Sequence, residues 1–249
     1  MSIAVCAVVR DPGPDALAAV QAQSFAPEHL VSHRGSWHDA VAEAPTRDAD
    51  WLWLLEGDAV PEPGALEALV APLRDPAGLP APALLSSRVA ASGGGPHPSS
   101  TPWIPLLDRA VVIAAAQHRV ASLRLARWGS MLVHRNAIAE HGPPLSDFAG
   151  GADDLEWTAR ILREGHGYLV PRSLVTRPAA PGGTVLSADE VRDRVRMLRG
   201  ERWIAQEPVW FAFMLGVDAT REIRAAPRPR TAGRLARGVA AGLASIARG

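Results

Sequence analysis

The segment WLWLLEGDAVP, residues 51–61, decides which fold we expect for this chain. Its apolar run stops at two carboxylates, Glu56 and Asp58, which a single glycine separates. An uninterrupted apolar run bounded by turn residues is typical of a parallel strand that is covered on both faces. In open α/β sheets, ligands bind just outside the carboxyl ends of such strands. The segment therefore predicts a buried strand that delivers two acids to the binding edge of a sheet.

Strand patterns and helix patterns alternate on both sides of this segment. Apolar runs predict strands at residues 3–9, 30–33, 51–55 and 83–89, and amphipathic runs predict helices at residues 15–23, 37–44 and 64–73. Such alternation is typical of a mainly parallel sheet with helices on its faces. We therefore expect an α/β fold, followed by a predominantly helical C-terminal region.

Glu56 and Asp58 have two explanations. Acids followed by prolines, here Pro61 and Pro63, are ordinary turn chemistry, so the segment alone could be no more than a strand end. While a chain stays extended, residues i and i+2 point the same way, and these two side chains could then hold one cation between them. Two hard oxygen ligands favour Mg²⁺ or Mn²⁺.

A second acidic cluster, DFAGGADDLEW, occupies residues 147–157. A helical pattern runs from there to Gly165, so Asp153 and Asp154 are expected at the start of a helix. Capping of that helix explains one aspartate well. The other can face a cleft and accept a proton from a substrate hydroxyl.

Together these two segments resemble the family 2 glycosyltransferases of the GT-A fold, in particular the bacterial rhamnosyl- and galactofuranosyltransferase-like branch. Residues 51–69 are similar to the family run WLWLLDDDAVPEPGALEAL, which carries the Asp-any-Asp site for metal and diphosphate, although Glu56-Gly57-Asp58 stands where three aspartates are usual. Residues 148–166 are similar to the family segment FFxxGDDxEWxxRxxRxGH, which carries the catalytic base. The resemblance covers most of the chain and implies a Rossmann-like GT-A fold.

The resemblance also implies an activity. It is the inverting transfer of a sugar from a nucleotide-diphosphate sugar to an acceptor hydroxyl, in the synthesis of a cell-envelope glycan or glycolipid. Asp154 stands at the position of the family's base, with Asp153 beside it. Glu56 and Asp58 would hold Mg²⁺ or Mn²⁺, which neutralises the charge that develops on the departing diphosphate.

The donor nucleotide is expected beside the ends of the first two strands. The first strand ends in Val9, Arg10 and Asp11, and the second is followed by Gly35 and Ser36. In the family these positions border the nucleotide, so the resemblance assigns all five residues to donor binding, together with Glu56.

Three departures from the family pattern keep an alternative open. The first strand lacks the usual Thr-Tyr-Asn, His33 stands where an acid contacts the nucleotide base, and Thr176 stands where a metal-binding His is common. A catalytically degenerate GT-A protein, which binds a glycan, a lipid or a partner enzyme without turnover, would also fit. A nucleotidyltransferase combines a similar sheet with metal carboxylates, but no glycine-rich basic loop follows the first strand.

Composition limits the kinds of binding partner and the cellular location that we expect for the protein. The 249 residues carry a formal net charge of zero, which gives no electrostatic argument for nucleic acid. A single cysteine, Cys6, excludes an intramolecular disulfide framework. The N-terminus has no basic leader, and no apolar run reaches the roughly 18 residues of a membrane span. We therefore expect a cytoplasmic protein.

The C-terminal segment differs from the rest of the chain. After Glu222 there are arginines but no acids, so we expect a domain at residues 1–222 and a basic amphipathic tail at residues 223–249. Four apolar residues could share one face of a helix in this tail: Leu235, Val239, Leu243 and Ile246. This pattern is typical of a helix that lies on an anionic membrane, here the inner face of the cell membrane. A solvated tail and a subunit contact explain it equally.

Residues 91–102, ASGGGPHPSSTP, interrupt the alternation of strands and helices. Their composition is typical of a flexible loop and not of a core. A lid over the acceptor and a plain surface insertion explain this loop equally.

Overall fold

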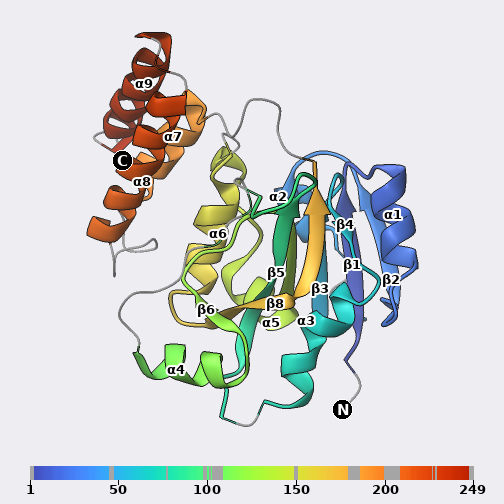
Figure 1. Cartoon of the computed structure of the whole chain (residues 1–249). Helices are drawn as coiled ribbons and strands as arrows, with labels where there is room; N and C mark the ends of the chain where they lie inside the picture. The colour runs from blue at the N-terminus through green and yellow to red at the C-terminus, as the bar shows by residue number, and fades with distance from the viewer. Residues whose placement is uncertain are drawn as a thin grey trace.

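The computed structural model of the chain is shown in Figure 1. It describes residues 3–44, 48–76, 78–97, 100, 102, 109–148, 151–178, 186–198, 208–225, 227 and 229–246. The strands are β1 (Val5–Arg10), β2 (His29–His33), β3 (Trp51–Glu56), β4 (Val60–Pro61), β5 (Pro82–Ala91), β6 (Ala121–Leu123), β7 (Ser130–His134) and β8 (His166–Arg177). The helices are α1 (Pro14–Gln21), α2 (Trp37–Ala42), α3 (Ala65–Arg74), α4 (Arg109–Gln117), α5 (Arg135–His141), α6 (Asp153–Ile161), α7 (Ala188–Arg196), α8 (Pro208–Ala225) and α9 (Pro229–Ile246), with a short 3₁₀ helix, η2 (Ser146–Phe148).

All eight strands of the described chain belong to one sheet, in the order β2-β1-β3-β7-β5-β8-β4, with β6 paired to β8. β2, β1 and β3 are parallel to one another, and β5 is parallel to β8. β7 lies between β3 and β5 and is antiparallel to both. The α/β class and the mainly parallel sheet that the sequence predicts are therefore confirmed.

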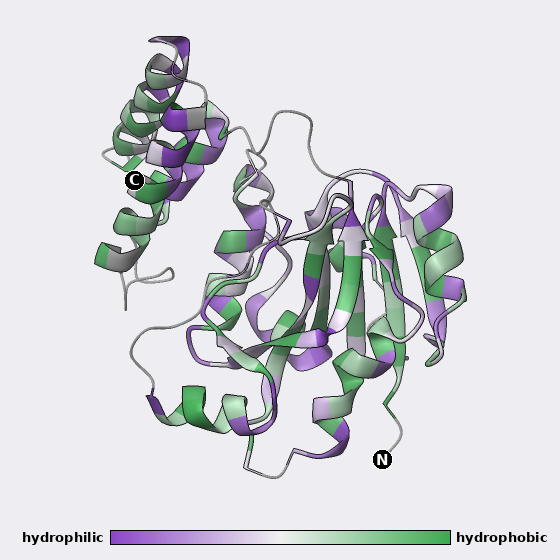
Figure 2. Cartoon of the chain, viewed as in Figure 1, coloured by the Kyte–Doolittle hydropathy of each residue, from purple (hydrophilic) through white to green (hydrophobic). Residues whose placement is uncertain are grey.

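β3, the strand predicted at residues 51–55, lies at the centre of the core. Every residue of β3 is buried, and its side chains alternate between two apolar clusters. Leu52 and Leu54 pack with α2, α5 and α6, whereas Trp53 and Leu55 pack with α1, α3 and α4. Figure 2 shows the matching hydrophobic colour along the central strands. Burial on both faces explains why this run has no polar residue before Glu56.

The chain turns sharply where β3 ends. Gly57 and Asp58 form a turn, and the carbonyl of Gly57 accepts a hydrogen bond of 2.9 Å from the Gly13 amide. A Cβ at Gly57 would lie 2.0 Å from the carbonyl oxygen of Asp11. Only glycine therefore allows the ends of β1 and β3 to approach this closely.

The three C-terminal helices have an apolar cluster of their own. It contains Leu186, Val191, Val195, Leu215 and Leu235. α9 packs closely on α7, because a Cβ at Gly238 would lie 2.5 Å from the Ala188 carbonyl oxygen. Figure 1 shows these helices as a bundle beside α6, away from the sheet.

The expected boundary after Glu222 falls inside α8, and the division into two domains stays a prediction from the sequence. Of the apolar stripe, Leu235 is 6% exposed, whereas Val239 and Leu243 are 39% and 57% exposed. Residues 226, 228 and 247–249 of the expected tail lie outside the described residues. Within the described helices, none is long and apolar enough to cross a membrane.

The close approach at Gly57 generates a stability prediction. Gly57→Ala should lower the free energy of unfolding by about 1–3 kcal/mol, because the added methyl group meets backbone atoms that cannot rotate away. Gly64→Ala is the matched control, since a Cβ there meets nothing within 4 Å. Urea unfolding followed by circular dichroism measures both. Equal stability of the two variants would show that the β1 and β3 ends are less tightly packed than described.

Candidate functional site

Glu56 is held at the carboxyl end of β3 by two donors. It is paired in register with Arg10 of β1, whose Nη2 lies 2.8 and 2.9 Å from the two carboxylate oxygens. The indole Nε1 of Trp37, the first residue of α2, donates to Oε1 at 3.0 Å. The Arg10 guanidinium also lies 5.1 Å from the centre of the Trp37 ring. Glu56 is only 9% exposed and is thus a fixed, charge-paired group.

Asp58 is held by a different arginine. Arg177, the last residue of β8, places Nε 2.7 Å from Oδ1 and Nη2 3.1 Å from Oδ2 of Asp58. Such a two-point contact is the strong geometry for a guanidinium and a carboxylate. Nη1 of Arg177 lies 3.0 Å from the hydroxyl of Ser100. The side chain of Arg177 is 14% exposed and that of Asp58 is 47% exposed, so the carboxylate lies nearer the protein surface than the guanidinium.

A shared divalent cation does not fit this arrangement. The sequence prediction required an extended chain from Glu56 to Asp58, but β3 ends at Glu56 and a turn follows. Each carboxylate uses both oxygens on a different arginine. Among the described residues, no three or more His, Cys, Asp or Glu side chains are grouped so that they could hold a metal ion. Glu56 and Asp58 therefore do not form the shared metal site expected from the sequence; each forms an ion pair with an arginine instead.

Trp128 connects the two acidic segments. Its ring stacks on Trp37 with centroids 4.4 Å apart, and it lies 5.8 Å from the ring of Trp157 in α6. Its backbone amide donates to Asp154 Oδ2 at 2.9 Å, and its carbonyl accepts from the Ser100 hydroxyl at 2.7 Å. Trp128 therefore contacts Trp37, Asp154 and Ser100, and so connects the surroundings of Glu56, the second acidic segment and the surroundings of Arg177.

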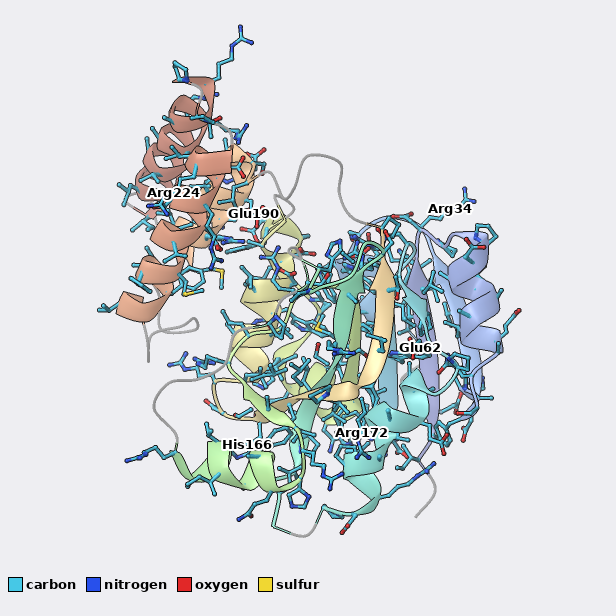
Figure 3. All side chains as sticks on the ribbon, in the orientation of Figure 1. Arg34, Glu62, His166, Arg172, Glu190 and Arg224 are labelled. Atoms are coloured by element: carbon cyan, nitrogen blue, oxygen red, sulfur yellow. The ribbon has the colours of Figure 1, made fainter. Side chains whose placement is uncertain are left out.

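Asp154 lies in the first turn of α6 and is 2% exposed. Its Oδ2 also lies 3.0 Å from Nε of Arg127, which in turn pairs with Glu190 of α7 at 3.4 Å. Burial raises the pKa of Asp154 to about 6, although the charge of Arg127 lowers it. Glu190, which is labelled in Figure 3, thus links the C-terminal bundle through Arg127 to the second acidic segment.

Asp153 has different surroundings. It is half-buried, and burial raises its pKa. The Trp128 side chain and the positive charge of Arg10 lower this pKa, and the negative charge of Glu56 raises it. Asp153 therefore lies within electrostatic range of the Arg10–Glu56 pair, whereas Asp154 is fixed to Trp128 and Arg127.

The five residues expected beside the nucleotide lie at the same end of the sheet, but in unequal positions. Val9 is fully buried and presents only backbone to a ligand. Asp11 is exposed, has a φ of 47°, and accepts from the Gly35 amide at 3.3 Å. Ser36 caps α2, because its hydroxyl accepts from the Asp39 amide. In Figure 3, Arg34 marks this end of the molecule and His166 the opposite end.

Sequence reasoning named Arg10 but missed three other partners of these acids, Trp37, Arg177 and Arg127. Trp37 follows Gly35-Ser36 directly, and Arg177 follows the Thr176 that stands where the family has a metal-binding His, so both had a positional signal. Arg127 had none. The loop at residues 91–102 was expected to contribute nothing to a core, but His97 is 3% exposed and Ser100 is 2% exposed. His97 Nε2 lies 3.1 Å from the Pro178 carbonyl oxygen, which anchors the loop beside Arg177.

A surface pocket of about 300 Å³ lies at the other end of the sheet. It is lined by His134 at the end of β7 and by Glu164 and Gly165 before β8, among others. Neither acidic segment contributes to it. The pocket is therefore separate from the candidate site.

Comparison with known proteins supports the fold. The structure is similar to GalNAc-T7 solved with UDP, GalNAc and Mn²⁺, with a TM-score of 0.53 and 13% identity over 77% of this chain and 47% of that chain. It is similar to S. aureus TarS, with a TM-score of 0.51 and 9% identity over 82% of this chain and 41% of that chain. The structure of S. aureus TarS 1-349 has the same TM-score and identity, and the match covers 82% of this chain and 68% of that chain.

These structures have the GT-A glycosyltransferase fold, so the expected fold is confirmed. The chain spans about half the length of the GalNAc-T7 structure, and identities this low concern the fold alone. No family model and no curated protein matches the sequence.

The burial of Asp154 generates a prediction about pH. Because its pKa in the folded protein is about 6, and a free aspartate titrates near about 3.9, the folded state binds this proton more tightly than the unfolded chain. The stability that this carboxyl contributes should therefore fall as the pH rises from about 4 to about 6.

Urea unfolding of the wild type and of Asp154→Asn between these pH values provides the measurement. The free energy of unfolding of the wild type minus that of the variant should decline through this window and level off above it. A difference that grows with pH would mean that pairing with Arg127 outweighs burial.

Proposed function

We propose that this chain is a glycosyltransferase that moves a sugar from a nucleotide-diphosphate sugar to an acceptor hydroxyl. The observation that carries the proposal is the meeting of two acidic segments, distant in sequence, around Trp128 at the carboxyl end of β3. Ligands bind at this end of an open α/β sheet. The similarity in fold to GalNAc-T7, solved with UDP, GalNAc and Mn²⁺, supports the same class of donor.

The donor nucleotide would lie along the ends of β1 and β2. Asp11 and Gly35 line this edge, and the backbone of Val9 borders it. Arg10, whose side chain is 26% exposed, would face the diphosphate. A guanidinium suits this role because it can bind two phosphate oxygens at once. We do not assign a divalent cation to Glu56 and Asp58, because both are held by arginines.

The acceptor hydroxyl needs a group that takes its proton. We assign this role to the Asp153–Asp154 pair, with Asp153 as the carboxylate that reaches the acceptor. Asp153 is the more exposed of the two, and its pKa responds to the charges of Arg10 and Glu56, whereas Asp154 is bound to the Trp128 backbone amide and to Arg127. A raised pKa suits a base that works near neutral pH. The acceptor oxygen would attack the anomeric carbon as the diphosphate leaves from the opposite side, which inverts the configuration.

A second function has one specific observation in its favour. Both acids of the first segment are neutralised by arginines in the structure, which would suit a GT-A protein that binds a glycan or a partner enzyme without turnover. This alternative predicts binding without product. Transfer by the wild type therefore separates the two functions.

Asparagine variants of the two aspartates test the proposed base. Asp153→Asn should keep donor binding but lower transfer by about 10²–10⁴-fold, because an amide has the shape of the carboxyl group but cannot take the proton. Asp154→Asn is the matched comparison and should affect stability more than transfer. Calorimetric titration with a nucleotide-sugar panel measures binding, and mass spectrometry of the product measures transfer.

Three results would contradict parts of the proposed function. Loss of transfer by Asp154→Asn with donor binding and stability intact would give the role of base to Asp154, the residue that the family resemblance favours. Donor binding by the wild type without product in any donor and acceptor pair would support the non-catalytic alternative. A wild type that binds no nucleotide sugar would overturn the proposed function.

We further propose that the protein works on a cell-envelope glycan or glycolipid at the inner face of the membrane. The exposed residues of α9 support this, because Val239 and Leu243 are apolar while Arg230 and Arg237 are exposed cations. Basic helices with an exposed apolar face bind anionic membrane surfaces. The cytoplasmic location stays a prediction from the sequence.

Vesicle sedimentation tests the membrane contact. Because truncation would expose the α7 surface that α9 covers, point substitutions are the better probe. Leu243→Ser should reduce sedimentation with vesicles that contain anionic lipid and leave the thermal midpoint unchanged. Leu145→Ser, at an exposed leucine before η2, is the control. If the wild-type protein does not sediment with anionic vesicles at low salt, the proposed membrane role is wrong.

A further inference from the structure

We propose that Arg177, together with Arg10, takes the place of a divalent cation, so that this chain binds the donor diphosphate without metal. This inference rests on the proposed function, because it specifies how the same site holds its donor. The resemblance implies a cation between Glu56 and Asp58, and the structure places a guanidinium on each of these acids instead.

The guanidinium of Arg177 is built into the site. Nε and Nη2 are bound to Asp58, and Nη1 lies 3.0 Å from the Ser100 hydroxyl and 3.5 Å from the Trp128 carbonyl oxygen. Ser100 is itself 2% exposed and is fixed by its bond to the same carbonyl. Arg177 is thus held from both sides, by Asp58 and by the buried Ser100, which pre-orients its charge.

A cation at Asp58 would have to displace this guanidinium or sit beside it. Displacement would cost the two-point contact with Asp58 and the bond to Ser100. A position beside it would place two like charges within a few ångströms, in a partly buried region where repulsion is stronger than in water. The oxygens of Glu56 are likewise already bound, by the guanidinium of Arg10 and the indole of Trp37, so a cation would have to displace these donors too.

The arginines supply the charge that a cation would supply. A divalent ion between two carboxylates and two guanidiniums on two carboxylates have the same net charge. Because Arg10 and Arg177 come from β1 and β8, they approach the acids from two sides. As the sugar leaves, the bonding electron pair stays on the diphosphate oxygen, and preorganised guanidinium donors stabilise this negative charge.

Diphosphate binding with and without metal is the test. UDP, GDP, dTDP and inorganic pyrophosphate are titrated calorimetrically into the full chain, once with Mn²⁺ and once with EDTA. At least one nucleoside diphosphate should bind, with affinities in the two conditions that agree within about twofold. Mn²⁺ alone should keep the electron paramagnetic resonance signal of the free ion when the protein is added.

Substitutions of Arg177 connect this binding to the guanidinium. Arg177→Ala should weaken binding in EDTA by about 10–100-fold, the loss expected for a hydrogen bond to a charged group. Arg177→Lys, which keeps the charge but loses the planar fork, should fall between it and the wild type. Arg177→Lys also provides the test of the guanidinium if the Arg177→Ala variant does not fold. Arg172→Ala, at an exposed arginine of the same strand, is the control and should bind as the wild type does.

The opposing results separate this inference from the proposed function. Binding that requires Mn²⁺, together with loss of the free-ion signal that Asp58→Asn restores, would overturn the inference and leave the glycosyltransferase proposal standing. Metal-free binding that neither Arg177 variant weakens would also overturn it. If no nucleoside diphosphate binds in either condition, the proposed function fails and this inference fails with it.

Discussion

The rest of the site depends on the position of Trp128. Its ring packs between Trp37 and Trp157, its amide holds Asp154, and its carbonyl holds Ser100. Because these bonds run in different directions from one buried residue, the strand that carries the first acids and the helix that carries the second cannot shift independently. A stack of aromatic rings resists sliding, and backbone hydrogen bonds fix the distance. The structure thus joins the two acidic segments through the ring contacts and backbone hydrogen bonds of Trp128.

The charges around this connection are arranged in pairs. Arg10 neutralises Glu56, Arg177 neutralises Asp58, and Arg127 neutralises Asp154. Buried charges that lose a partner are costly, so the pairs of the buried acids Glu56 and Asp154 also fix the geometry of their members. Asp153 differs, because it has no such close arginine among the ion pairs of the described residues and is half-buried, whereas Asp154 is fully buried. This contrast is the physical basis for assigning the reactive role to Asp153 and the structural role to its neighbour.

The sequence predicts the fold well because the fold follows from local patterns. The apolar run at residues 51–55 became β3, and the helical pattern after Asp153 became α6, each within a residue or two of its expected start. The partners of the acids were not predictable in this way. Arg177 reaches Asp58 from a strand more than a hundred residues away, and its contact depends on the turn at Gly57. The loop at residues 91–102 has a loop composition, yet Ser100 is buried because Arg177 and Trp128 give its hydroxyl partners.

The central claim is that a sugar-nucleotide diphosphate binds where the two acidic segments meet. A crystal structure of the chain with a bound nucleoside diphosphate tests this claim most directly. The account predicts phosphate oxygens within hydrogen-bonding distance of Arg10 and Arg177, with Asp153 facing the open side. A diphosphate bound elsewhere, for example in the pocket beside His134 and Glu164 at the opposite end of the sheet, would contradict it.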